Sequence, residues 1–462
     1  MLTKAKGIRS AVLLLLAIYL LVMMLSTGCA QRQQDDVVSL DVWSLWEDGT
    51  LLRGANIYQR RVYPELDGDD FMGSGPTGPP YTREDLAALA GMGADFVVVS
   101  HPGLFTETSP YGLDVDMQAN LDRLLEMIAA EGMYAVIAFR TGPGRSDFTF
   151  YWEEEGTWFD ESYLDDRVWE DRSAQDAWVD MWRYTAQRYR GNPAVVGYEL
   201  MVEPNSNDRL LDVWNPEEFY EEYGGTLYDW NQLFPRITYA IREVDGEIPV
   251  LVGGNGYSAV DWLPFVEPSG DPRTVYTVHQ YAPHSYTHQD FDDEGYSYPG
   301  VFGMDGDGED EAFDRAWLED CIADAADFSR RHDVPIAVTE FGVVRWAPEA
   351  ASFIRDSIAL FEEEGWNHAL WVWNPAWREW NREVDYFDFM HGPDPTHHAD
   401  VQSSDLIEVI KGSWEKNRNS WVSQDLRPRQ VPDRDRESAG TAVTAGRRLS
   451  TISGKVNLGQ EI

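Results

Sequence analysis

The chain has 462 residues, 43% of them hydrophobic, and its 80 acidic against 37 basic residues give a formal net charge of -43. This length predicts one large α/β domain with insertions, or two domains, around a sizeable core. The negative charge argues against nucleic acid and anionic membrane surfaces as partners. Because the acidic residues are dispersed and Lys is scarce, we expect a protein that stays soluble in concentrated salt, as in halophiles; an acidic secreted protein is the alternative.

The first 29 residues are organised like a secretory signal peptide. Three basic residues precede an apolar run at 11–25, which is short of the roughly 20 residues that span a bilayer. The following Ser-Thr-Gly-Cys at 26–29 resembles a bacterial lipoprotein box, although Leu25 stands four residues before the cysteine instead of three. We therefore expect Cys29 to carry lipid at the mature N-terminus. This predicts a location in the cell envelope, on the outer membrane or the cell surface, with membrane contact only through that lipid. An ordinary signal peptide, with secretion, and an uncleaved anchor are the alternatives.

Eight short apolar segments follow a predicted polar tether at 30–50, and helical patterns lie between most of them. Strands alternating with helices predict a parallel sheet, and eight of them fit an α/β fold of the (β/α)₈ TIM-barrel type, a single catalytic domain at 51–426 with long βα loops. A doubly wound open sheet is the alternative, but no Gly-rich phosphate turn follows the first strand. The tail at 427–462 has few apolar residues and is predicted to be disordered. The predicted strands are 51–58, 94–100, 134–140, 194–202, 249–254, 274–281, 335–340 and 368–373.

Neither of two metal-like patterns is complete. The acidic stretch at 304–311 resembles part of a calcium loop but lacks the ligand spacing, so we interpret it as a solvated loop. His284 and His288 are four residues apart, in a Tyr- and Pro-rich loop that offers no further ligands. We therefore expect no metal and no organic cofactor. Cys321 is the only other cysteine beside Cys29, so a lipid-modified chain has no intrachain disulfide.

Acidic residues stand at the ends of two predicted strands, where the active site of such a barrel lies. The fourth strand, in the stretch YELMVEPN, ends at Glu203, and the seventh ends at Glu340. Two carboxylates at matching strand ends are what glycosidic bond cleavage needs, one as an acid and one as a nucleophile. For either glutamate alone, a structural ion pair with an arginine is the alternative.

Strand alternation predicts which neighbours of these acids share their face. Along the fourth strand it groups Glu203 with Met201 and Glu199, of which we expect Glu199 to be structural and paired with an arginine such as Arg140 or Arg53. It also places His279 with Tyr281 at the end of the sixth strand. At the end of the eighth strand it places Trp371 with Trp373.

On these motifs the chain resembles glycoside hydrolase family 5, from about Leu51 to Trp373 and as far as Lys416 at most. YELMVEPN resembles the fourth-strand motif, which implies that Glu203 is the acid/base, with Asn205 as a supporting residue. AVTEFG resembles the seventh-strand motif, which implies that Glu340 is the nucleophile. The remaining matches are VHQYAP, which maps His279 and Tyr281 near the nucleophile; WVWNP, which maps Trp373 under the sugar, with Trp371 beside it; and GMYAVIAFRTGPG for the third strand.

Three positions depart from the family pattern. The family has Asn before the acid/base, where it contacts the sugar 2-hydroxyl; here that residue is Val202. The third strand usually ends in His and here ends in Arg140, while the Arg of the second strand maps to Val98. We expect Arg140 to supply the missing positive charge, by pairing with Glu199 or by keeping Glu340 ionised.

The resemblance implies a monomeric retaining hydrolase of β-linked polysaccharide or oligosaccharide, of the β-glucan or β-mannan type. In this interpretation Glu340 attacks the sugar while Glu203 holds the proton, helped by like-charge repulsion, and the carboxyl groups lie about 5–5.5 Å apart. Tyr281 should hydrogen-bond Glu340, and the aromatic loops at 146–159 and 284–300 should shape the cleft. Because of Val202, the alternative function is that of a carbohydrate-binding lipoprotein at the cell surface, with a catalytically impaired barrel. A structural envelope protein is a third.

Overall fold

The computed structural model describes residues 41–71, 75–292, 295–304, 310–373 and 382–419, which all belong to one compact unit. The predicted signal peptide with Cys29 and the tail at 427–462 lie outside these residues, as does most of the acidic stretch at 304–311. Among the residues described, none of the helices is both long and apolar enough to cross a membrane.

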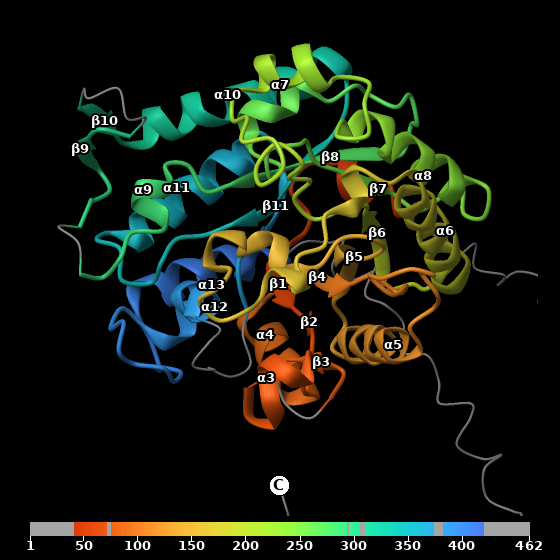
Figure 1. Cartoon of the computed structure of the whole chain (residues 1–462). Helices are drawn as coiled ribbons and strands as arrows, with labels where there is room; N and C mark the ends of the chain where they lie inside the picture. Colours follow the sequence, from red (N-terminus) through yellow and green to blue (C-terminus); the bar gives the residue numbers. More distant parts are fainter. Residues whose placement is uncertain (1–40, 72–74, 293–294, 305–309, 374–381, 420–462) are drawn as a thin grey trace, which may run out of the picture. The chain divides into compact units, whose positions relative to one another are not determined.

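Eight parallel strands close into a barrel in their order along the chain, and helices lie outside this ring (Figure 1). The (β/α)₈ prediction is therefore confirmed, and each observed strand overlaps its predicted segment. The strands are buried along almost their whole length, which explains why they read as apolar runs. They are β1 (Arg53–Tyr58), β4 (Phe96–Pro102), β5 (Tyr134–Thr141), β6 (Val195–Glu199), β7 (Val250–Val252), β8 (Thr274–Gln280), β11 (Ile336–Phe341) and β12 (Asn367–Leu370).

The helices between the strands begin and end at residues suited to those positions. In the first, Thr82 and Asp85 form a capping box, and the helix ends at Gly93, whose φ of 107° favours glycine. The covering helices are α4 (Arg83–Met92), α5 (Val115–Ala130), α6 (Arg172–Tyr189), α8 (Phe234–Arg242), α10 (Arg315–His332), α11 (Ala350–Glu363) and α13 (Asp405–Asn419). Shorter elements lie in the loops: α3 (Pro64–Phe71), α7 (Pro216–Tyr223), α9 (His284–Thr287), α12 (Arg382–Phe387), the pair β2 (Arg60–Arg61) and β3 (Thr77–Gly78), and the hairpin β9 (Gly300–Phe302) and β10 (Glu311–Phe313).

Strand alternation divides the core into two layers. An outer cluster joins strand residues to the covering helices, for example Val97 to Leu121 of α5. An inner cluster contains strand residues such as Val136 and Val196 but none from the covering helices, so it fills the barrel. Val98, at the position where the family has Arg, belongs to this inner cluster and contributes no charge.

Residues 41–50, the last part of the predicted tether, are folded onto the barrel. Helix α2 (Ser44–Glu47) buries Leu45 and Trp46 against the inner cluster. The Trp46 indole donates a hydrogen bond to the carbonyl of Val196 (3.0 Å), and the Asn367 amide donates to the carbonyl of Leu45 (2.7 Å). The prediction of a tether at 30–50 is therefore wrong for these residues, because two apolar side chains in a polar context close the amino-terminal end of the barrel.

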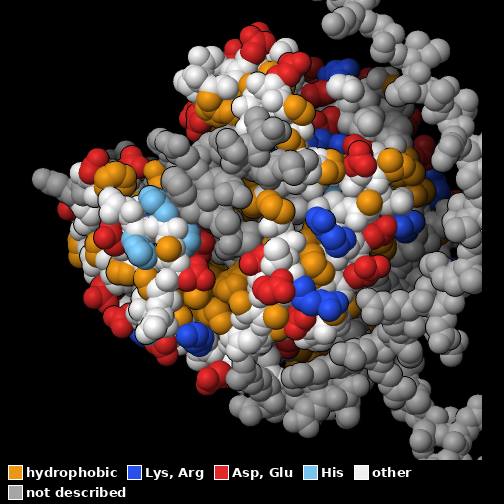
Figure 2. Space-filling view, turned by 90° about the horizontal axis from the view of Figure 1, so that it is seen from below, with side chains coloured by type: hydrophobic (Ala, Val, Ile, Leu, Met, Phe, Trp, Pro, Cys, Tyr) orange, Lys and Arg blue, Asp and Glu red, His pale blue; other side chains and the backbone are white. Residues whose placement is uncertain are grey.

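The described surface mixes charges of both signs. On the face shown in Figure 2, Asp and Glu side chains are spread widely, and the Lys and Arg side chains lie next to them. Ion pairs such as Arg242 with Asp271 (2.7 Å) and Arg315 with Glu363 (2.7 Å) account for this mixture. Surface pairs of this kind contribute little stability individually.

Candidate active site

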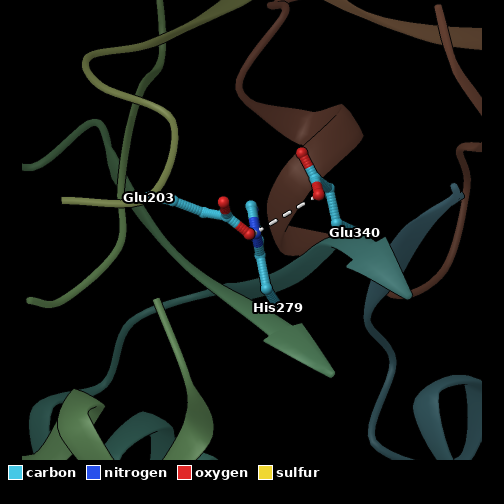
Figure 3. Close-up of side chains that lie close together, drawn as sticks. All are labelled: Glu203, His279 and Glu340. Atoms are coloured by element: carbon cyan, nitrogen blue, oxygen red, sulfur yellow. Dashed lines mark hydrogen bonds and ion pairs between the residues drawn. The ribbon is translucent and has the colours of Figure 1, made fainter. Parts of the chain in front are cut away.

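Glu203, His279 and Glu340 converge at the carboxyl end of the barrel. His279 Nδ1 lies 2.9 Å from a carboxylate oxygen of Glu203 and 3.5 Å from one of Glu340. Figure 3 shows the two carboxylates facing each other, with the His279 ring between them. One oxygen from each glutamate and a ring nitrogen of His279 all lie within 4.8 Å of one another. The two carboxyl groups are therefore closer than the roughly 6.5–9.5 Å of an inverting glycosidase, as expected of a retaining one.

Glu203 reaches this position through a turn rather than along a strand. Strand β6 ends at Glu199, and Glu203 has a φ of 52°, in the left-handed region that residues with a Cβ seldom adopt. Met201 packs in the outer cluster, whereas Val202 packs inside the barrel. The expectation that Glu199, Met201 and Glu203 share one face is therefore wrong for Met201, because alternation stops where the strand ends.

Glu199 lies inside the barrel below the two facing carboxylates. Its side chain accepts a hydrogen bond from the Thr339 hydroxyl (3.0 Å) and lies 3.6 Å from His279 Nε2. The expected arginine pairing is wrong, because Arg53 binds Glu362 (2.6 Å) outside the barrel. His279 thus contacts three buried carboxylates.

Arg140 is the next-to-last residue of strand β5 and lines the cavity beside the two facing glutamates. It pairs with Asp147 (3.3 Å), from the loop that follows, and its guanidinium lies 3.7 Å from the centre of the Phe150 ring. Pairing with Glu199, one of the two predicted roles, is therefore not observed. The other role agrees in direction, since the charge of Arg140 lowers the pKa of Glu340, although burial outweighs it.

The two facing carboxyl groups hold their protons unequally. Burial raises the pKa of Glu340 to about 8, and the neighbouring Glu203 adds to this effect. Burial would also raise the pKa of Glu203, but the hydrogen bond and charge of His279, with Arg140 and Arg145, bring it below its ordinary value. The carboxylates raise the pKa of His279 well above its ordinary value despite burial, so the imidazole is charged at neutral pH. The two carboxyl groups together therefore hold one proton at neutral pH, beside a charged His279.

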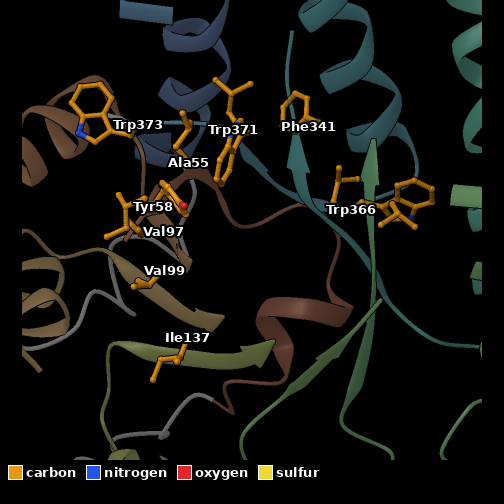
Figure 4. Close-up of a cluster of buried hydrophobic side chains, with 14 of the residues drawn as sticks. Ala55, Tyr58, Val97, Val99, Ile137, Phe341, Trp366, Trp371 and Trp373 are labelled. Atoms are coloured by element: carbon orange, nitrogen blue, oxygen red, sulfur yellow. The ribbon is translucent and has the colours of Figure 1, made fainter. Parts of the chain in front are cut away.

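Of the predictions for aromatic side chains, the one for Tyr281 is confirmed and the one for Trp373 is not. The Tyr281 hydroxyl donates a hydrogen bond to Glu340 (3.3 Å), as predicted. Trp371 lines the cavity, but Trp373 packs against Phe389 with ring centres 6.1 Å apart. The rings of Trp371 and Trp373 point in different directions in Figure 4. The mapping of Trp373 to the sugar is therefore wrong. Strand β12 ends at Leu370, so alternation cannot be extended to the two tryptophans.

A cavity of about 990 Å³ contains the facing glutamates and extends over the neighbouring loops. Both loops predicted to shape the cleft line it, the first with Phe150 and Trp152 and the second with His284 and His288. Trp214, which is 56% exposed, adds a free aromatic face to the cavity.

Sequence reasoning missed the group that supports the cavity on the Glu203 side. Trp214 stacks on Tyr257, with ring centres 6.2 Å apart and planes 11° apart. Asp208 accepts hydrogen bonds from the Tyr257 hydroxyl and from the Trp152 indole (2.9 Å). The sequence contains 19 tryptophans, but their number does not say which of them meet. Asn205, predicted to support the site, does not line the cavity; its side chain accepts a hydrogen bond from Arg145 (3.0 Å).

Glu203, His279 and Glu340 are also the one group of potential metal ligands close enough to share an ion among the described parts of the chain. The raised pKa of His279 opposes such a use, because an imidazole must be neutral to bind a metal. His284 and His288, the other histidines considered, stack on each other with ring centres 4.7 Å apart.

A (β/α)₈ barrel with two glutamates facing each other at the ends of its fourth and seventh strands is the architecture of a class of glycoside hydrolases. A family model described as cellulase (glycosyl hydrolase family 5) matches residues 71–376. The chain therefore belongs to glycosyl hydrolase family 5, and the resemblance found in the sequence is confirmed.

Individual relatives are distant. Endoglucanase C of Acetivibrio thermocellus is 25% identical over 241 residues, which cover 51% of this chain and 58% of that protein. The chain thus spans less than two thirds of this relative. A crystal structure of a glycoside hydrolase has a TM-score of 0.58 and 20% identity, over 79% of this chain and 99% of the other. An endoglucanase of Thermotoga maritima has a TM-score of 0.56 and 17% identity, over 80% and 100%. These structures show the shared fold.

Proposed function

We propose that the protein is a retaining glycoside hydrolase that cleaves β-linked glucan or mannan. The observation that carries the proposal is the pair of buried carboxylates, Glu203 and Glu340, within 4.8 Å of each other across His279 in a large cavity. Membership of a family described as cellulase, and similarity to proteins described as endoglucanases, support the substrate class.

The proposed reaction has two steps. A carboxylate oxygen of Glu340 attacks the anomeric carbon, the bond to the leaving-group oxygen breaks, and the proton of Glu203 passes to that oxygen. A water molecule then attacks the anomeric carbon, gives its proton to Glu203, and the ester bond to Glu340 breaks. Tyr281 supports Glu340, and Trp371 offers a stacking face for the sugar.

His279 connects the two carboxyl groups that share one proton. The attack requires that proton on Glu203 and an ionised Glu340. Nδ1 of His279 is within reach of both carboxylates, at 2.9 and 3.5 Å. The imidazolium can give its Nδ1 proton to Glu203 and take the proton of Glu340, so that it ends charged as it began and leaves Glu340 ionised.

The charge of the cavity favours a neutral glycan. Among the residues that the structure describes, eight Asp and Glu side chains line it, against Arg140, the charged His279 and no lysine. A sugar that carries carboxylates would meet like charge in the cavity, whereas glucose and mannose units would not.

A binding protein without turnover is the second candidate, and Val202 is the observation that favours it. Its side chain packs in the inner cluster where the family has the Asn that contacts the sugar 2-hydroxyl. Loss of such a contact reduces the stabilisation of the transition state by up to several kcal/mol. This candidate predicts affinity for β-glycans without release of reducing ends.

Release of reducing sugar tests both candidates. The substrates are β-1,4-glucan, β-1,3-glucan, mannan and xylan, each in low and high salt. Glu340→Ala and Glu203→Ala should lose activity, whereas Glu319→Ala, which removes an exposed glutamate of α10, should not. Turnover that survives Glu340→Ala would contradict the assigned nucleophile. Affinity for a glycan without any turnover would favour the second candidate.

We also propose, from the sequence, that Cys29 attaches the monomeric protein to the cell envelope through lipid. Incorporation of labelled palmitate into the protein, lost in Cys29→Ser, is the expected result. Equal labelling of both would contradict it.

A further inference from the structure

Arg145 is a buried arginine whose two terminal nitrogens bind mainly the segment that carries Glu203. One terminal nitrogen donates to the carbonyls of Arg140 (3.1 Å) and Val202 (2.7 Å). The other donates to the carbonyl of Glu203 (2.6 Å) and to the side-chain oxygen of Asn205 (3.0 Å). All four terminal N–H bonds therefore have an acceptor, and three of the four acceptors lie between positions 202 and 205.

The charge of Arg145 has no carboxylate partner among the described residues. The side chain is completely buried, and no ion pair involves it. The Phe150 ring covers the guanidinium at 4.9 Å and also covers Arg140 at 3.7 Å. A buried cation bound only by neutral oxygens is unusual, since desolvation of the charge is costly without an anion. The contacts of Arg145 therefore suggest that it serves to fix the backbone segment to which it is bound.

The segment it holds needs support. Glu203 has a φ of 52° and follows Val202, the last inward-facing residue of its segment in the inner cluster. Conformations of this kind persist where the surroundings fix them, and they concentrate at functional sites. On the far side of the turn, the Tyr257 N–H donates to the carbonyl of Pro204 (3.1 Å). Arg145 fixes the near side.

We infer that Arg145 is a positioning residue for Glu203: it clamps the left-handed turn so that the Glu203 carboxyl faces Glu340 and the leaving-group oxygen. The inference rests on the proposed function of Glu203 as the acid/base. Arg145 touches neither the substrate nor the reacting atoms, because it does not line the cavity.

A displaced acid affects only those substrates that need its proton. Departure of a phenolate of high pKa requires protonation of the leaving oxygen as its bond to the anomeric carbon breaks, whereas dinitrophenolate leaves as the anion. A loosened Glu203 should therefore lower kcat/KM for phenyl β-cellobioside strongly and for the dinitrophenyl analogue little. In the second step, azide can attack the anomeric carbon without a general base, so it should compensate for a misplaced Glu203.

The experiment compares Arg145→Met and Arg145→Lys with the unsubstituted full chain, using both cellobiosides. Arg345→Met is the control, because Arg345 is equally buried and binds the carbonyl and the carboxylate of Asp385 and the carbonyl of Gly392, which do not line the cavity. We expect Arg145→Met to lower kcat/KM about 100-fold for the phenyl substrate and less than about threefold for the dinitrophenyl one. Arg145→Lys keeps the charge but not the two terminal nitrogens of the guanidinium. Its kcat/KM for the phenyl substrate should lie between those of the Met variant and the unsubstituted protein. If the Met variant does not fold, the Lys variant carries the comparison.

Azide should raise kcat of the Arg145 variants on the dinitrophenyl substrate and leave the unsubstituted protein and Arg345→Met unchanged. Equal losses on both substrates, or the same selectivity in Arg345→Met, would overturn the role of Arg145 alone. Absence of turnover by the unsubstituted protein would overturn the proposed function, and this inference with it.

Discussion

The charge of His279 should set the pH range in which the site is active. The two-step reaction requires one proton on the pair formed by Glu203 and Glu340. That state exists above the lowered pKa of Glu203 and below the pKa of about 8 at Glu340. The pH profile of kcat/KM, which reports the free enzyme, should therefore be bell-shaped, with an alkaline limb near pH 8.

The substitution His279→Gln removes a positive charge 2.9 Å from Glu203 and 3.5 Å from Glu340 while retaining a hydrogen-bond donor. A cation favours the ionised form of a carboxyl group, so its loss raises both pKa values and moves both limbs to higher pH. At 3.5 Å, two unit charges interact by about 5 kcal/mol at an effective dielectric constant of about 20, and by about 1 kcal/mol in bulk water. At about 1.4 kcal/mol per pKa unit, this corresponds to a shift of about 1 to 3.5 units.

The assay is kcat/KM from about pH 3 to 11 on an aryl β-cellobioside. Tyr281→Phe is the control, because it removes a neutral hydrogen bond to Glu340 and no charge. It should lower activity with much less movement of the limbs. A His279→Gln profile that keeps its limbs where the unsubstituted protein has them would refute the assignment of a charged His279 between the two carboxylates.

Three further predictions concern the cavity. Trp371→Ala should raise KM about tenfold with little loss of stability. Trp373→Ala should instead lower the free energy of unfolding by about 3–5 kcal/mol and leave KM unchanged. Thermal melts and kinetics on a soluble β-glucan test this, and the opposite pattern would restore Trp373 as the sugar contact. Trp214→Ala should weaken cleavage of oligosaccharides several-fold without changing cleavage of short aryl glycosides, as measured by product release, and equal losses on both would contradict its role as a platform. Carboxymethyl substitution of a β-glucan should lower kcat/KM, and added salt should reduce that difference because it screens the acidic lining; a difference independent of salt would contradict the electrostatic explanation.

The barrel and its two central acids could be predicted because they depend on local patterns. Each strand is an apolar run bounded by turns, and each observed strand overlaps its prediction; β8, for instance, spans 274–280 where 274–281 was expected. Glu340 is the next-to-last residue of its strand, so alternation places it correctly. The family motif supplied the same residue independently.

Contacts beyond the strand ends could not be predicted in the same way. Alternation assumes an extended backbone, and it fails at Met201 and Trp373, because β6 has ended at Glu199 and β12 at Leu370. The contacts of Arg140 could not be predicted for a related reason. Its guanidinium meets Asp147 and Phe150, which lie within ten residues in the sequence but on a loop whose path no periodicity encodes.

The departures from the family pattern gain a physical interpretation when they are considered together. Val202 removes a polar side chain from the site and joins the inner cluster, which leaves its carbonyl as the polar group at that position. Arg145 binds that carbonyl and the next one, behind the proposed acid/base. Loss of the Arg145 contacts should act through the position of Glu203 and therefore depend on the leaving group, whereas loss of a contact with the 2-hydroxyl should affect all leaving groups alike. The dependence of rate on the leaving group therefore separates these two kinds of defect.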